Sequence, residues 1–103
     1  MKLLSKETYK KIEKILYDAH ETTDPKVIKA LESLNNFFKG SEHEEFLNTY
    51  YYNRHKYNNR CPKNSMLFKK ICNQLYIEEP TLYIIKKEVI YKAAMIFYKN
   101  GVI

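Results

Sequence analysis

The sequence predicts an all-α protein, with about five helices in a compact bundle that forms one domain over residues 1–103. Two observations carry this prediction. Apolar residues recur every three or four positions along most of the chain, as on the buried side of an amphipathic helix. The composition is 45% apolar and 15% aromatic with only two Gly and three Pro, which is typical of a compact, mostly helical protein.

The first expected helix runs from about Ser5 to His20. Its apolar stripe consists of Tyr9, Ile12, Ile15, Leu16 and Ala19. Asp24 and Pro25 then mark the start of a second helix, because Asp is a good N-cap and the fixed φ of Pro suits the first turn. Gly40 is expected to end this helix in the left-handed conformation. Its predicted buried side chains are Val27, Ile28, Leu31, Leu34 and either Phe37 or Phe38.

Ser41 is expected to cap a third helix, since Glu42, Glu44 and Glu45 follow at positions where the helix dipole favours negative charge. The predicted buried face of this helix is Phe46, Leu47 and Tyr50, extended by Tyr51 or Tyr52. The periodic pattern stops at Asn53, so residues 53–64 are predicted to form a basic loop. No Gly-rich linker separates the two halves of the chain, which favours a single domain.

The last part of the chain predicts a helix-turn-helix. Asn64 or Ser65 would cap a short fourth helix that ends at Tyr76, with Ile77 as the apolar residue of the turn. The inward residues of this helix are predicted to be Leu67 or Phe68, Ile71 and Leu75, with Cys72 as a small core or near-core residue.

Glu78 would cap a long fifth helix, with Pro80 at its first or second position, where the missing N–H costs little. The apolar stripe of this helix runs until Gly101 and consists of Leu82, Ile85, Val89, Ala93, Ile96 and Phe97. The C-terminal residues 101–103 would pack either on the first helix or on a second subunit.

The positive charge is concentrated in the second half of the chain. Residues 1–53 carry eight Lys/Arg and nine Asp/Glu, whereas residues 54–103 carry ten and three, giving −1 and +7. The stretch 54–70 contains no acidic residue and six basic ones: Arg54, Lys56, Arg60, Lys63, Lys69 and Lys70. This composition predicts a surface that meets a polyanion. A solvated lysine-rich loop is the other interpretation of the charge alone.

The segment from Glu44 to Ile103 resembles a known family. The stretches EEFLNTYYYN, KKICNQLYIEEPTLYIIKKEVIYKAAMIF and NGVI are similar to the C-terminal part of phage late-gene transcriptional activators of the RinA, ArpU and LtrC type. That part of the family is in turn similar to the DNA-binding region four of sigma factors. The resemblance implies an aromatic-rich helix, a short helix, a turn with an isoleucine, and a basic recognition helix. The first forty residues carry no motif.

On this resemblance we expect a DNA-binding transcriptional regulator of a phage or mobile genetic element, whose last helix enters the major groove. Double-stranded DNA is the expected partner. RNA polymerase or another regulator, and a second copy of the chain, are further ones. The residues expected near base edges are Glu79, Thr81, Tyr83 and Ile84. Those expected on phosphates are Lys69, Lys70, Lys86 and Lys87, with Arg54, Lys56, Arg60 and Lys63 of the basic loop.

Some residues depart from the family pattern. Family members carry Ser or Thr where Glu78 stands and a basic or small polar residue where Pro80 stands, and the loop from His55 to Lys63 is longer than expected. A second hypothesis is therefore a small helical protein-interaction module, such as an inhibitor or modulator of a regulator, that has lost DNA reading. Its interface would use Glu78 and Glu79 together with the tyrosines Tyr50, Tyr51, Tyr52 and Tyr57.

The sequence gives little support for other chemistry. His43, His55, Cys61 and Cys72 contain no CxxC or HxxxH pair, so a zinc site is not expected. No nucleotide-binding or catalytic motif occurs, and we expect neither an enzyme nor a cofactor. Two cysteines and the lack of a signal peptide or a long apolar span predict a cytoplasmic protein of a bacterial host cell without a membrane partner.

Overall fold

The computed structural model describes residues 4–57 and 63–103, and in these residues every regular element is helical, so the all-α prediction is confirmed. The elements in chain order are α1 (Lys6–Tyr17), α2 (Pro25–Phe38), α3 (Glu42–Phe46), the π-helix Leu47–Tyr52 that continues α3, the 3-10 turn Arg54–Tyr57, α4 (Asn64–Leu75) and α5 (Glu79–Lys99). None of these described helices is both long and apolar enough to cross a membrane.

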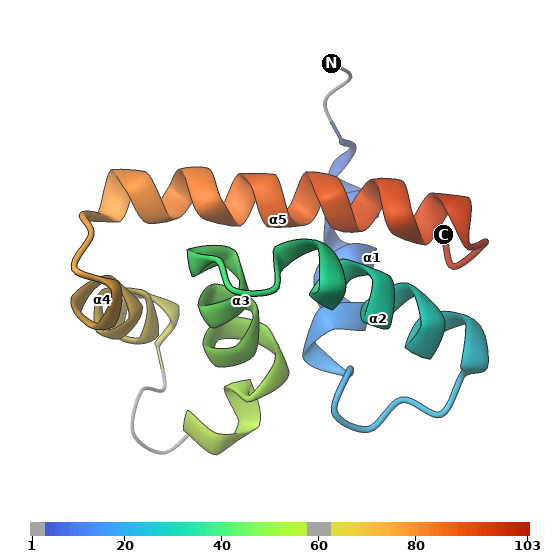
Figure 1. The fold of residues 1–103 in the computed structure, drawn as a ribbon, viewed down its shortest axis with the longest axis horizontal. Helices are drawn as coiled ribbons and strands as arrows, with labels where there is room; N and C mark the ends of the chain where they lie inside the picture. The colour runs from blue at the N-terminus through green and yellow to red at the C-terminus, as the bar shows by residue number, and fades with distance from the viewer. Residues whose placement is uncertain (1–3, 58–62) are drawn as a thin grey trace.

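Helix α5 organises the fold. Its 21 residues span about 31 Å at 1.5 Å per residue, nearly the longest extent of the molecule, 35 Å. Figure 1 shows α5 running horizontally across the upper part of the molecule, with α2, α3 and α4 below it. It contacts each of the other four α-helices, so its inner face closes the core. The buried residues of α5 are Leu82, Ile85, Val89, Ile90, Ala93, Ala94 and Phe97.

The core is aromatic where α3 becomes the π-helix. Tyr50 and Tyr51 are consecutive and both buried. The wider π turn, in which the Asn53 N–H donates to the Asn48 carbonyl over 2.8 Å, presents both rings to neighbouring helices. Phe46 packs against both of them, with ring centroids 5.0 and 5.7 Å away. The predicted buried face of the third helix is therefore confirmed.

Several predicted helix ends are confirmed by local hydrogen bonds. The Ser5 hydroxyl accepts from the Thr8 amide at 3.1 Å, and the Asp24 carboxylate accepts from the Lys26 amide at 3.0 Å. Gly40 has a φ of 81°, the left-handed conformation that stops α2. Pro80 is the second residue of α5, as expected.

Other predicted ends and faces were wrong. Helix α1 stops at Tyr17 rather than near His20. Ser41 and Glu78 occupy N-cap positions but make no capping bond, and Ser41 instead donates its hydroxyl to the Phe38 carbonyl at 2.6 Å. Lys63 takes the N-cap position of α4, because Asn64 is already helical.

On α2 most of the predicted buried face is confirmed, since Leu31, Leu34 and Phe38 are buried and Val27 is half-buried. Ile28 was wrongly predicted, because it is exposed and Ala30 lies in the core instead. The C-terminal tail also has a defined place. Val102 and Ile103 are half-buried and line one recess with residues of α1 and α2, so the tail packs on its own chain.

Candidate nucleic-acid interface

Helices α4 and α5 are joined by the short turn 76–78. Tyr76 takes the left-handed conformation with φ 56° and ψ 43°, and the amides of Tyr76 and Ile77 both donate to the Cys72 carbonyl. This arrangement satisfies the last carbonyls of α4 and turns the chain sharply. Figure 1 shows α4 nearly end-on beneath the first turns of α5, so the two helices cross at a wide angle, as in a helix-turn-helix.

The first turns of α5 are open to solvent on their outer side. Glu79, Thr81, Tyr83 and Ile84, the residues predicted near base edges, are all exposed, with Tyr83 61% and Ile84 60% accessible. The Tyr83 ring also packs against Phe68 of α4 with centroids 4.5 Å apart, which fixes the start of α5 on α4. The charge of this turn is negative, since Glu78 and Glu79 are both exposed.

Four exposed lysines gather around α4. Lys56 lies on the 3-10 turn, Lys63 at the start of α4, and Lys69 and Lys70 within α4. The 3-10 turn lies beside α4, since the Lys70 ammonium is 6.0 Å from the Tyr57 ring. We call these four residues the basic end of the molecule. The sequence places no acidic residue between Glu45 and Glu78, so nothing in this stretch neutralises their charge.

Arg54, also predicted to contact DNA, instead contacts other segments of the protein. Its guanidinium lies 5.0 Å from the Tyr50 ring and 6.0 Å from the Tyr17 ring, and it donates a hydrogen bond to the Asn64 side chain. The side chain thereby joins the 3-10 turn to α1 and to the start of α4. Arg60 lies outside the described residues, so its predicted role stays a prediction.

The adjacent lysines Lys86 and Lys87 have different environments. Lys86 is 20% exposed, and its ammonium lies 4.0 Å from the Glu13 carboxylate and 5.2 Å from the Tyr50 ring. Lys87 is exposed and lies over the Tyr91 ring at 5.8 Å. Because its ammonium group faces Glu13 of α1, Lys86 is not part of the basic end.

The tyrosines of the π-helix are not a surface cluster. Tyr50 and Tyr51 are buried, while Tyr52 and Tyr57 are half-buried, so the prediction of an exposed Tyr50–Tyr52 interface was wrong. Burial raises the pKa of Tyr51 far above its usual range, and the negative charge of Glu13 raises it further. Burial likewise raises the pKa of Tyr52. These hydroxyls are neutral structural groups at physiological pH.

The His and Cys side chains whose types could ligate zinc lie in unrelated surroundings. The His43 ring stacks on Phe38 with centroids 4.8 Å apart, and the His55 ring stacks on His20 at 4.1 Å. Cys72 is buried, as predicted, and burial and then Glu79 raise the pKa of its thiol. Cys61 lies outside the described residues. Within the described ranges no group of three or more His, Cys, Asp or Glu side chains has the arrangement of a metal site.

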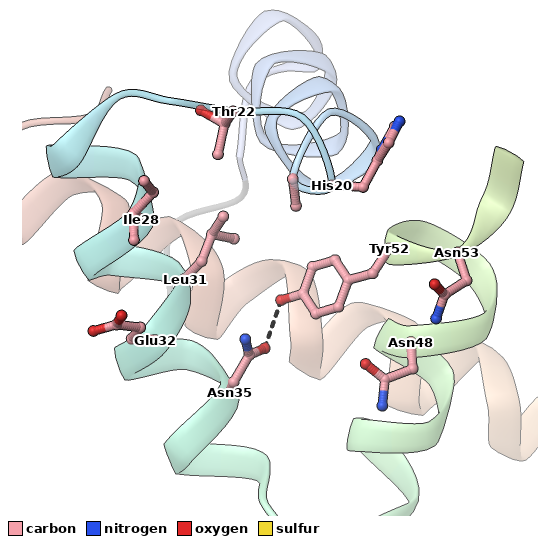
Figure 2. A pocket seen from close by; sticks show the side chains of 10 residues that line it. His20, Thr22, Ile28, Leu31, Glu32, Asn35, Asn48, Tyr52 and Asn53 are labelled. Carbon is pink, nitrogen blue, oxygen red and sulfur yellow. Dashed lines mark hydrogen bonds between the residues drawn. The ribbon is translucent and has the colours of Figure 1, made fainter.

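Sequence reasoning missed a recess of about 420 Å³ between the α1–α2 connection, α2 and the π-helix. Figure 2 shows the Tyr52 ring crossing it, with the hydroxyl donating to the Asn35 side chain at 2.7 Å. Its rim carries the amides of Asn48 and Asn53, and its apolar wall is Leu31. The lining residues come from three separate segments, so no local sequence pattern could have indicated the recess.

Comparison with known proteins found no relative of this chain. No protein-family model, curated protein or solved structure matches this chain. The resemblance to the phage activators therefore stays a prediction.

Proposed function

We propose that this protein binds double-stranded DNA as a transcriptional regulator of a phage or mobile genetic element. The observation that carries the proposal is the basic end, four exposed lysines around α4 beside the open first turns of α5. In a helix-turn-helix the first helix lies across the phosphate backbone while the second enters the major groove. Lys56, Lys63, Lys69 and Lys70 would then contact phosphates.

The exposed residues Thr81, Tyr83 and Ile84 would lie nearest to the base edges in this arrangement. Tyr83 and Ile84 offer apolar contact to thymine methyl groups, and Glu79 would accept a hydrogen bond from cytosine N4. The two glutamates at the start of α5 oppose phosphates, so most of the affinity should come from the basic end.

The test is binding to duplex DNA measured by fluorescence anisotropy over a range of salt concentrations. Four phosphate contacts predict a log–log salt slope of about −3.6, and the double variant Lys69→Glu with Lys70→Glu should reduce its magnitude to about 1.8. The matched control is Lys10→Glu with Lys11→Glu, two adjacent exposed lysines on α1. Equal losses in both double variants, or no binding of the parent protein at low salt, would overturn the proposal.

The second candidate, a protein-interaction module that modulates a regulator or RNA polymerase, is favoured by one observation. The outer face of α5 exposes large apolar side chains, among them Met95 at 65% and Tyr98 at 78% accessibility. Such a face is unusual for a free surface helix.

A further inference from the structure

Helix α5 carries two apolar faces. The inner one is buried in the core, and the outer one exposes Ile84, Met95 and Tyr98, with the half-buried Tyr91 between them. Ile84, Tyr91 and Tyr98 are spaced by seven residues, so they lie in one line along the helix. A seven-residue apolar repeat on an exposed helix is the pattern by which helices pair side by side.

We infer that the outer face of α5 binds the same face of a second copy of the chain, with the two helices antiparallel about Tyr91. In this register Tyr91 meets Tyr91 of the other copy at the two-fold axis. Ile84 of each copy meets Tyr98 of the other, because both residues are seven positions from Tyr91. All three layers of the contact are then apolar, and the surface is self-complementary, as a two-fold interface requires.

The charges beside this line fit a second, antiparallel copy. Glu88 and Lys92 lie on the same flank of α5, since the Glu88 carboxylate reaches His43 at 3.5 Å and the Lys92 ammonium lies over the Phe37 ring at 3.9 Å, both on the α2–α3 side. In an antiparallel two-fold pair the same flanks meet. Glu88 of one copy then comes within two residues, about 3 Å along the axis, of Lys92 of the other. The pair forms twice by symmetry.

A parallel pair would bring the two basic ends to the same end of the dimer, where their lysines repel. The antiparallel pair instead places the basic ends at opposite ends. The charge pattern therefore favours the antiparallel pair.

The dimer has a consequence for DNA binding, and this part of the inference rests on the proposed function. Ile84 belongs both to the dimer contact and to the outer side of the first turns of α5. A dimerised protein would therefore hold its groove-reading surface covered, while the basic ends stay exposed. Self-association and groove binding would compete, so DNA binding would depend on protein concentration.

Dimerisation is tested first without DNA, by sedimentation velocity over a range of protein concentrations. Tyr98→Glu should weaken self-association by about 30-fold or more, since it buries a carboxylate against Ile84 of the other copy. Tyr76→Glu, the same change at a tyrosine that is 95% exposed on the α4–α5 turn, should leave it unaltered. A parent protein that stays monomeric at all concentrations, or a Tyr98→Glu variant that dimerises normally, would overturn the inference.

The register is tested by oxidation of single cysteines in a Cys61→Ser, Cys72→Ala background. Tyr91→Cys should cross-link to itself, because the two sites face each other. Met95→Cys should not, since its two copies are offset by about 12 Å along the axes. Efficient self-cross-linking of Ile84→Cys would show a parallel pair and refute the antiparallel one.

Competition is tested by DNA affinity at a protein concentration where the parent is dimeric. Tyr98→Glu should then bind DNA more tightly than the parent, and an unchanged affinity would refute the competition. If the parent protein dimerises but does not bind DNA, the proposed function is refuted and the dimer is not. If the parent protein binds DNA but does not dimerise, the dimer is refuted and the proposed function is not.

Discussion

The hydroxyl of Tyr51 donates a hydrogen bond to the Glu13 carboxylate over 2.9 Å and so ties the π-helix to α1. The Lys86 ammonium approaches the same carboxylate from α5 at 4.0 Å. Three helical segments thus meet at one partly buried charge. Because such a carboxylate is costly to bury without partners, each of these contacts should contribute to the stability of the fold.

Removing the Tyr51 hydroxyl should destabilise the protein. Tyr51→Phe keeps the ring in the core and leaves Glu13 without its hydrogen-bond donor, so we expect the free energy of unfolding to fall by about 1 to 2 kcal/mol. Urea unfolding followed by circular dichroism measures it. Tyr52→Phe is the control. It removes the exposed hydrogen bond to Asn35 and should cost about 0.5 kcal/mol. A Tyr51→Phe variant as stable as the parent would refute the role assigned to this bond.

Alkaline pH should destabilise the fold through the same tyrosine. Burial raises the pKa of Tyr51 in the folded protein, whereas in the unfolded chain a tyrosine ionises near pH 10. The unfolded state therefore loses a proton that the folded state keeps. The contribution of Tyr51 to stability is complete below about pH 10 and declines as the pH rises further, by about 1.4 kcal/mol per pH unit.

Unfolding free energies measured on either side of pH 10 should show this decline for the parent and a shallower decline for Tyr51→Phe. Tyr76→Phe, at an exposed tyrosine, should keep the parental slope. Identical slopes in all three proteins would contradict the assignment. The half-buried Tyr52, whose pKa is also raised by desolvation, should add to the parental slope.

The two adjacent lysines of α5 give a third prediction. Lys86→Met removes the positive charge beside Glu13 and should lower the free energy of unfolding by about 1 kcal/mol. Lys87→Met changes an exposed residue and should stay within about 0.5 kcal/mol of the parent. Urea unfolding of the two variants side by side measures the difference. Equal stability would mean that Lys86 does not interact with Glu13 in solution, and both lysines would then be free to contact DNA.

The inner face of α5 and the capped starts of α1 and α2 were predictable from the sequence, because spacing and capping are local properties. The basic end was also visible in the sequence as a stretch without acidic residues. The direction of Lys86 was not, because its partner Glu13 lies on another helix far away in the chain. The π turn at Leu47–Tyr52 was not predictable either, because no periodic pattern indicates such a turn.

The exposure of the outer face of α5 could not be predicted from the sequence for a different reason. Its seven-residue repeat is present in the sequence, but the same segment also contains the inner apolar stripe. From periodicity alone the helix therefore looks apolar on all sides. Only the packing of the other helices separates the two faces. Ile84 and Tyr98 then emerge as exposed, while Leu82 and Phe97 are buried.

The turn between α4 and α5 gives the last prediction. Among the residues that the structure describes, Tyr76 is the one non-glycine residue with a positive φ. Its side chain is almost fully exposed, so its ring contributes little packing. A side chain in this conformation costs roughly 1 kcal/mol relative to glycine. Tyr76→Gly should therefore be more stable than Tyr76→Ala by about 1 kcal/mol, although glycine destabilises most other positions.

The comparison of these two variants is clean because both remove the tyrosine ring, and urea unfolding measures the difference. A matched pair at Asn73, an exposed position inside α4, should give the opposite order, since alanine favours a helix interior over glycine by about 1 kcal/mol. If the alanine variant is the more stable one at both positions, Tyr76 is not left-handed in solution. The α4–α5 crossing required for groove binding would then need a different turn.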